Sequence, residues 1–313
     1  MDFARSDTNG MRLAEGIVST LLGAIAWGFS GTCVQFLFAT TEMDSLLLTC
    51  IRELGAGIAF LVVLLARERH TLRQVFRDGW SLRRLAVFGT FGLFLNSAMY
   101  ATTISFTNAG TATVLQSLNI VFALALTCLA TRRRPGKAEV CALVLALAAT
   151  YLIATKGDPG RLQMPPAGLA FGILTACTAT FYTMYPKPLF EKWGSFPVTG
   201  LGMLQGGITG LIVCGATGRL AGGIPVHDAT GWAVLAIAVL IGTFGAYGLF
   251  LHGVSIVGPV VGNMLGAMEP VSATVISALW LATPFTAADW AGLALMVATI
   301  VLIALNGRAE GDD

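Results

Sequence analysis

Glu269 is the residue of this sequence that is best placed to do chemistry. It lies in VGPVVGNMLGAMEPVSATVISALWLA (257–282), an almost unbroken apolar run. Gly258, Gly262 and Gly266 recur every four residues, and Glu269 falls on the same face of a continuous helix. Small residues let a second helix approach, so we expect the carboxylate to point into a bundle, where it binds a substrate or exchanges a proton. The alternative is a structural carboxylate that bonds helix ends or waters.

Two further charged residues, Arg52 and Glu53, lie inside another apolar run, at 45–66. A charge near the bilayer centre costs about 2.5–3.5 kcal/mol on insertion scales, so both residues need partners. We interpret Arg52 in two ways. It is either a gating or anion-recognising arginine that pairs with Glu53, Glu269 or a substrate carboxylate, or an arginine that snorkels to the surface.

Amide and aromatic side chains lie at a similar depth in other apolar runs. Asn96 and Tyr100 share a helical face, Trp27 and Ser30 share another, and Tyr182 has a corresponding depth. Small-molecule pockets combine flat apolar surface with a few directed hydrogen bonds. Ordinary packing explains any one of these residues better, and it is the set that favours a pocket. No cofactor or metal is predicted. The predicted substrate-binding residues are Glu269, Asn119, Gln116, Trp27, Asn96, Tyr100, Tyr182 and, ranked lowest, Asn263.

Composition places these residues in a membrane. Of the 313 residues, 55% are hydrophobic and only 12% are charged, whereas an average soluble domain carries about 25% charged residues. A soluble protein could not cover its surface with so few polar groups, so we predict an all-α integral membrane protein in contact with lipid. The basic residues are interpreted as topology signals, and no nucleic-acid partner is expected.

Ten apolar runs predict ten transmembrane helices. The first has features of a signal peptide but continues without a break, so it is kept as a span. With the N-terminus inside, 15 Lys and Arg residues lie on inner segments and 3 on outer loops. This asymmetry predicts a multi-pass protein of the cytoplasmic (inner or plasma) membrane with both termini in the cytoplasm. The runs are 16–39, 45–66, 82–104, 109–131, 138–155, 166–186, 198–217, 231–252, 257–282 and 288–306.

The two halves of the chain, 1–157 and 158–313, are related at a constant offset of 150 residues. Residues 119–157 align with 269–307 without a gap, with 11 identities over 39 positions, and Glu269 falls opposite Asn119. Each half therefore holds five spans, and an odd number inverts the second half relative to the first. Many secondary transporters are built as such inverted repeats, with the substrate site near the bilayer midplane.

The duplicated pattern of N/E-x-V within one span, a short turn and a final LIA span resembles the EamA-like branch of the drug/metabolite transporter superfamily. AWGFSG (26–31) and IRELGAG (51–57) resemble its first two spans. The family usually has a proline in span 4, but Ile120–Phe122 has none, so whether this span bends like the one with Pro270 stays open. The resemblance implies a ten-helix transporter of small metabolites, often an exporter, with cytoplasmic termini.

We therefore expect an exporter that moves a small metabolite, such as an amino acid, an amine or a related amphipathic compound, by alternating access. Proton coupling and facilitated diffusion both stay open, as does the oligomeric state. The alternative is an intramembrane serine hydrolase that uses Ser30 of GFSG (28–31), with His252 as its base. Ser30 is predicted near the middle of its span and His252 near the end of its own, so their depths disagree.

Overall fold

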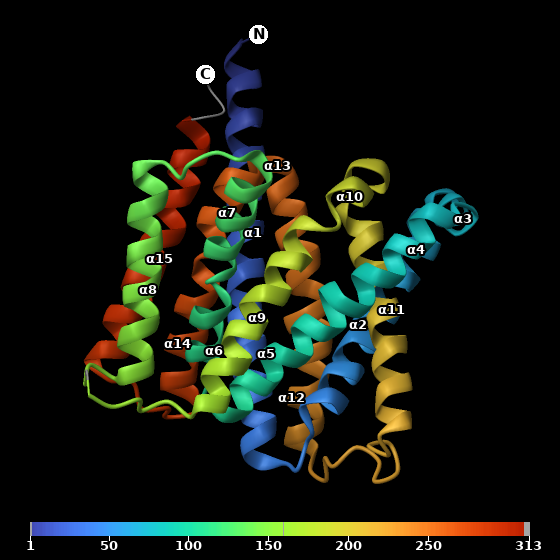
Figure 1. Ribbon diagram of the computed structural model, residues 1–313. Coiled ribbons are helices and arrows are strands. Elements are labelled where there is room, and N and C mark those ends of the chain that lie inside the picture. The colour runs from blue at the N-terminus through green and yellow to red at the C-terminus, as the bar shows by residue number, and fades with distance from the viewer. Residues whose placement is uncertain (1, 159, 310–313) are drawn as a thin grey trace.

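The computed structural model describes residues 2–158 and 160–309, and within them the chain folds into helices joined by short connections, without strands (Figure 1). Two of the seventeen segments, η1 and η2, are π-helical. The segments are α1 (Asp2–Thr40), α2 (Ser45–Arg67), α3 (Arg69–Arg77), α4 (Gly79–Val87), η1 (Phe88–Phe94), α5 (Leu95–Phe106), α6 (Ala109–Gln116), α7 (Asn119–Thr131), α8 (Lys137–Thr155), α9 (Pro166–Met184), α10 (Lys187–Trp193), α11 (Ser195–Ala216), α12 (Ala229–Val239), η2 (Leu240–Gly245), α13 (Ala246–Gly266), α14 (Met268–Trp280) and α15 (Ala287–Ala309).

Nine helical stretches within the described residues are long and apolar enough to cross a membrane. They match nine of the ten predicted spans to within a few residues at most ends, and they make the chain a multi-pass membrane protein. The remaining predicted span, 257–282, is not among them. It is divided between the end of α13 and α14, and it holds the polar residues Asn263 and Glu269. The nine stretches are formed by α1, α2, α4–η1–α5, α6–α7, α8, α9–α10, α11, α12–η2–α13 and α15.

Both ends of the described chain lie on the same side of the bundle (Figure 1). The first turns of α1 and the last turns of α15 lie there, together with α3, α10 and the connection from α7 to α8. We call this end the terminus side and the opposite end the far side. Short polar caps begin two helices on the far side: Asp44 accepts from the backbone N–H of Leu46 at 3.0 Å, and Asn108 from that of Thr111 at 2.8 Å.

The two π-helical segments contain the same four residues. Gly89–Gly92 in η1 and Gly242–Gly245 in η2 both read GTFG. π-Helical turns are rare and are frequent at functional sites. The glycines also allow close packing. A Cβ on Gly242 would lie 2.5 Å from the Cβ of Ser30, so η2 rests directly on α1.

Two helices are interrupted at positions 150 residues apart. Between α6 and α7 the backbone at Ser117 has φ −63° and ψ −13°, and between α13 and α14 Ala267 has φ −60° and ψ −13°. Span 4 therefore breaks without the proline that its counterpart has after the break. Each interruption leaves a short helix that begins with a polar residue in its first turn, Asn119 in α7 and Glu269 in α14.

The prediction that Gly258, Gly262, Gly266 and Glu269 share one helical face is wrong, because it assumed that the ninth span is one continuous helix. Gly258 has φ +82° and ψ 164°, a conformation that glycine adopts without strain, and it turns the chain directly after Ile256 and Val257, which lie against Gly16 of α1. Gly262 and Gly266 follow that turn and pack against Val254 and Phe250 before it. The break at Ala267 then removes Glu269 from their helix, so it does not share their face.

Candidate functional site

A cavity of about 820 Å³ lies in the centre of the bundle. Its wall is contributed by α1, α2, α5, α6, α7, α9, α10, η2, α13, α14 and α15, so residues far apart in the sequence meet there. All ten residues singled out from the sequence line this cavity. These are Trp27, Arg52, Glu53, Asn96, Tyr100, Gln116, Asn119, Tyr182, Asn263 and Glu269.

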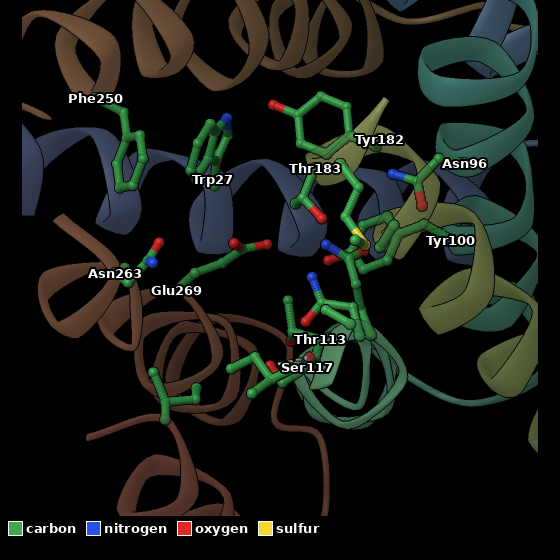
Figure 2. A pocket seen from close by; sticks show the side chains of 18 of the residues that line it. Trp27, Asn96, Tyr100, Thr113, Ser117, Tyr182, Thr183, Phe250, Asn263 and Glu269 are labelled. Atoms are coloured by element: carbon green, nitrogen blue, oxygen red, sulfur yellow. Dashed lines mark hydrogen bonds between the residues drawn. The ribbon is translucent and has the colours of Figure 1, made fainter. Parts of the chain in front are cut away.

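Glu269 enters the cavity from the first turn of α14. Figure 2 shows its carboxylate directed into the space below Trp27. No described residue donates a hydrogen bond to this carboxylate or pairs with it. The positive end of the α14 dipole favours a negative charge at this position. The backbone is held by α1, since a Cβ on Gly28 would lie 2.6 Å from the carbonyl oxygen of Glu269 and 2.1 Å from Ser272 Oγ.

Aromatic rings form one wall beside Glu269. The ring of Trp27 lies 4.7 Å from that of Tyr247 and 4.5 Å from that of Phe250, measured between centroids. Tyr182 continues the wall, 6.4 Å from Tyr247. Tyr247 and Phe250 were not predicted as site residues. They lie three residues apart in an apolar run, and only the assembled bundle shows which face of that run lines the cavity.

Arg52 is held by two hydroxyl groups and not by a carboxylate. Its Nη2 donates to Ser30 Oγ at 2.9 Å and to Thr243 Oγ1 at 3.2 Å. The predicted pairing with Glu53 or Glu269 is therefore wrong within the described residues, and the guanidinium does not snorkel to the surface. Thr243 lies in η2, so the π-helical GTFG segment supplies one of the two partners of this buried charge. Thr243 carries no signal that sequence analysis would have recognised as a partner of Arg52.

Glu53 is almost completely buried, with 2% of its surface exposed. Its Oε1 accepts a hydrogen bond from Ser97 Oγ at 2.7 Å, and its Oε2 has no partner among the described residues. A Cβ on Gly206 would lie 3.2 Å from Oε2, which shows how closely α11 covers the carboxyl group. A buried acceptor that lacks a partner is energetically costly and often marks a functional site.

Amide groups occupy the middle of the cavity wall. Thr178 Oγ1 donates to Asn96 Oδ1 at 3.0 Å, which leaves the amide nitrogen of Asn96 without a protein acceptor in the described chain. Thr180 Oγ1 donates to the backbone carbonyl of Asn119 at 3.2 Å and so ties α9 to the break before α7. Gln116 and Asn119 flank that break, and Asn263 lines the cavity from α13 (Figure 2). These amides can donate and accept hydrogen bonds to a polar ligand.

The cavity extends to the terminus side only. Its rim there includes the exposed residues Arg133 and Lys187, and Arg133 is bound to Glu139 at 2.6 Å. Among the described residues, none from the last turns of α1 or the first turn of α6, on the far side, lines the cavity. That side is filled by a buried apolar cluster that includes Cys33, Leu37 and Leu48. The cavity is thus accessible from one side of the bundle and sealed from the other.

The structure does not bring the residues of the hydrolase alternative together. Ser30 Oγ accepts from Arg52, whereas His252 Nε2 lies 3.2 Å from Glu15 Oε1. Glu15 and Ser30 are on the same helix and 15 residues apart, which is roughly 22 Å at 1.5 Å per residue. Ser30 therefore has no base within hydrogen-bond reach among the described residues.

Comparison with known sequences decides the family. The EamA-like transporter family matches the chain twice, over residues 14–155 and 166–305. The chain belongs to the EamA-like transporter family. It is 33% identical over 297 residues to the uncharacterized inner membrane transporter YicL of Salmonella typhimurium, with 94% of this chain and 96% of YicL covered. It is 22% identical over 273 residues to an uncharacterized transporter of Clostridium kluyveri, with 85% and 86% covered.

A solved structure shares the fold. It superposes with a TM-score of 0.62 at 19% sequence identity, and the match covers 93% of this chain and 98% of that chain. The family and the fold together show a membrane-embedded transporter for a small molecule. The substrate, the direction of transport and the energy source do not follow from the family, and they are inferred below from the geometry of the cavity.

Proposed function

We propose that this protein is a secondary transporter of the cytoplasmic membrane that exports a small amphipathic metabolite, such as an amino acid or an amine, by alternating access. The observation that carries the proposal is the central cavity, which is accessible from the terminus side and sealed on the far side. A carrier in one of its two end states has this shape. The opposite state would seal the terminus side and expose the same residues to the far side.

The second state requires two halves that move against each other, and we propose ten spans arranged as two inverted five-helix repeats, 1–157 and 158–313. Three correspondences support this arrangement: the helix breaks 150 residues apart, the two GTFG segments, and the double match to the family. A fourth is a pair of helix caps. Glu139 accepts from the backbone N–H of Gly136 at 2.8 Å, and Asp289, 150 residues later, accepts from that of Thr286 at 2.7 Å.

We propose that the terminus side faces the cytoplasm. The basic residues of the first turns of α1, of α3 and α4, and of the connection after α7 lie on that side, as the positive-inside rule expects for a cytoplasmic face. A reporter that folds only in the cytoplasm, fused after residue 313, tests the orientation. Activity of a periplasmic reporter at that position would reverse it.

Within the cavity, Glu269 is proposed to bind the substrate or to exchange the coupling proton. Asn119 and Gln116 would supply hydrogen bonds, and Trp27, Tyr100 and Tyr182 the apolar walls. Arg52 and Glu53 are proposed as gating residues. Their partners Ser30, Thr243 and Ser97 come from three other elements, so any motion of these elements must rearrange the hydrogen bonds of both charges.

Transport by the purified protein in liposomes tests the proposal. The vesicles carry an imposed pH gradient and an enclosed pH indicator, and amino acids and amines are supplied one at a time. We expect at least one compound to move protons through the wild-type protein and not through Glu269→Gln. Equal, gradient-independent flux of a compound in both proteins would remove Glu269 from coupling, and absence of flux for every compound would contradict transport of this substrate class.

A further inference from the structure

The charges of the cavity leave one carboxylate without a counter-charge. Arg52 and Glu53 are adjacent in α2 and bring opposite charges into one part of the cavity wall, where hydroxyl groups of other elements hold each of them. At the rim, Arg133 is bound to Glu139 by contacts of 2.6 and 2.8 Å. Lys187 is an exposed rim residue at the start of α10. Glu269 lies between these groups and pairs with none of them among the described residues.

The surroundings of Glu269 are those of a site for a positive charge. Trp27, Tyr247 and Phe250 form a continuous aromatic wall with centroid separations of 4.5–4.7 Å from Trp27. Aromatic faces attract ammonium groups, and tryptophan does so most strongly. A carboxylate beside such a wall adds a full negative charge, so both groups act on the same ligand atom.

A negatively charged group has no comparable site. The Nε and Nη2 donors of Arg52 are directed at Ser30 and Thr243 at 2.9–3.4 Å. A carboxylate could accept from Nη1 alone without displacing these hydrogen bonds, so it would lose the bidentate contact that makes arginine a strong anion site. The cavity therefore recognises the ammonium group of a ligand more strongly than a carboxylate on the same ligand.

We infer that the substrate is an organic cation, an amine with an apolar skeleton, whose ammonium group is held between Glu269 and the rings of Trp27, Tyr247 and Phe250. This inference rests on the proposed transport function and narrows its substrate class. The apolar skeleton extends toward Tyr182 along the rest of the cavity, whose whole volume is about 820 Å³, and the amides of Asn119 and Gln116 serve any polar substituent.

Four compounds with one phenyl ring and a short chain isolate the effect of charge. Phenethylamine is a cation, 2-phenylethanol is neutral, phenylacetate is an anion and L-phenylalanine is a zwitterion. Dissociation constants are measured by calorimetry on the purified wild-type protein, and hexylamine with 1-hexanol repeats the comparison without a ring. We expect each amine to bind at least about tenfold more tightly than its alcohol, which corresponds to ~1.4 kcal/mol. We also expect phenethylamine to exceed both phenylalanine and phenylacetate.

Variants distinguish a loss of the amine site from a loss of the fold. Glu269→Gln should abolish the preference of amine over alcohol, and Glu269→Asp, which keeps the charge, should retain part of it. Trp27→Leu should weaken phenethylamine more than 2-phenylethanol. The matched control is Glu42→Gln, which removes an exposed carboxylate outside the cavity and should change nothing. Thermal unfolding of each variant shows whether it is folded.

Three outcomes would overturn the inference: equal binding of amines and alcohols, tighter binding of phenylalanine or phenylacetate, or no binding of either amine at millimolar concentration. These results are distinct from failure of the transport proposal. Flux of an uncharged or zwitterionic compound without amine binding would leave transport intact and refute only the substrate class. Amine binding without flux in liposomes would refute the transport proposal and leave the substrate class intact.

Discussion

Ser277 Oγ donates a hydrogen bond to Gln35 Oε1 at 2.8 Å and so joins α14 to α1 beyond the sealed end of the cavity. The same carbonyl oxygen accepts from the backbone N–H of Ala109 at 2.9 Å, and Gln35 Nε2 donates to Thr283 Oγ1 at 2.9 Å. One side chain therefore ties α1 to α6, to α14 and to the connection that follows α14. Exposure of the cavity to the far side must break these bonds.

Gln35→Ala is predicted to favour the state that is open on the far side. Loss of the tie costs the sealed state about 1–2 kcal/mol, which changes a population ratio roughly 5- to 30-fold. Native Cys33, buried in the far-side cluster, reports the opening through its reaction with a membrane-impermeant maleimide after the other cysteines are replaced. Thr40→Ala, at the exposed end of α1, is the control. Equal labelling of both variants would show that Gln35 does not hold the far side closed.

Gly28→Ala is predicted to separate α1 from α14 and to displace Glu269. The new Cβ would lie 2.1 Å from Ser272 Oγ and 2.6 Å from the backbone nitrogen of Ala273, so a helix must shift. We expect a loss of about 1–3 kcal/mol in stability together with weaker phenethylamine binding. Gly248→Ala provides the comparison, because its Cβ would meet no atom within 4 Å. Thermal unfolding and calorimetry measure both effects, and wild-type binding in Gly28→Ala would contradict the geometry.

Ser97→Ala is predicted to destabilise the protein by about 1–3 kcal/mol, since it removes the hydrogen bond that Glu53 accepts and leaves both carboxyl oxygens buried without a partner. Addition of Glu53→Leu in the same chain should recover part of the loss, because the unpaired polar group is then gone. Ser105→Ala removes an exposed hydroxyl of the same helix and serves as the control. If Ser97→Ala alone is as stable as Ser105→Ala, Glu53 finds another hydrogen-bond donor, and the prediction fails.

Asp78 gives a pH dependence on the terminus side. Its hydrogen bonds with Lys192 and then Ser81 lower the pKa of the Asp78 carboxyl. A carboxyl whose pKa is lower in the folded than in the unfolded chain stabilises the fold at pH values above its unfolded pKa, about 3.9. This contribution is lost as the pH falls through the lowered value. The wild type should therefore unfold at a higher temperature than Asp78→Asn at neutral pH, and the two unfolding temperatures should converge at strongly acidic pH. A constant difference across this range would contradict the assignment.

Much of the fold follows from the sequence, because apolar length and basic asymmetry are strong signals along a membrane chain. The ends of α2 and α6–α7 agree with prediction to within one residue. The interruptions were harder to predict. Gly258 turns the chain within what reads as uninterrupted apolar sequence, and span 4 breaks at Ser117 without a proline. Both depend on helices packed from elsewhere in the bundle.

The candidate site, like the fold, has features that the sequence predicts and features that it does not. Polar and charged residues within apolar runs are conspicuous, and all ten predicted ones line the cavity. Their partners were not predictable, because they are ordinary hydroxyl residues of distant spans. Thr243 and Ser97 became partners of Arg52 and Glu53 only when η2 and α5 packed against α2. The two GTFG segments are 153 residues apart in the sequence, so they do not fall opposite each other at the constant offset of 150 that relates 119–157 to 269–307.

Alternating exposure of one cavity to the two sides of the membrane is tested most directly by a single cysteine at Ser117, which lines the cavity at the helix break. With the native cysteines replaced, Ser117→Cys is treated with an impermeant maleimide from each side in vesicles of both orientations. We predict reaction from both sides, slower from the far side and accelerated there by Gln35→Ala. Reaction from the terminus side alone, with or without Gln35→Ala, would contradict alternating access.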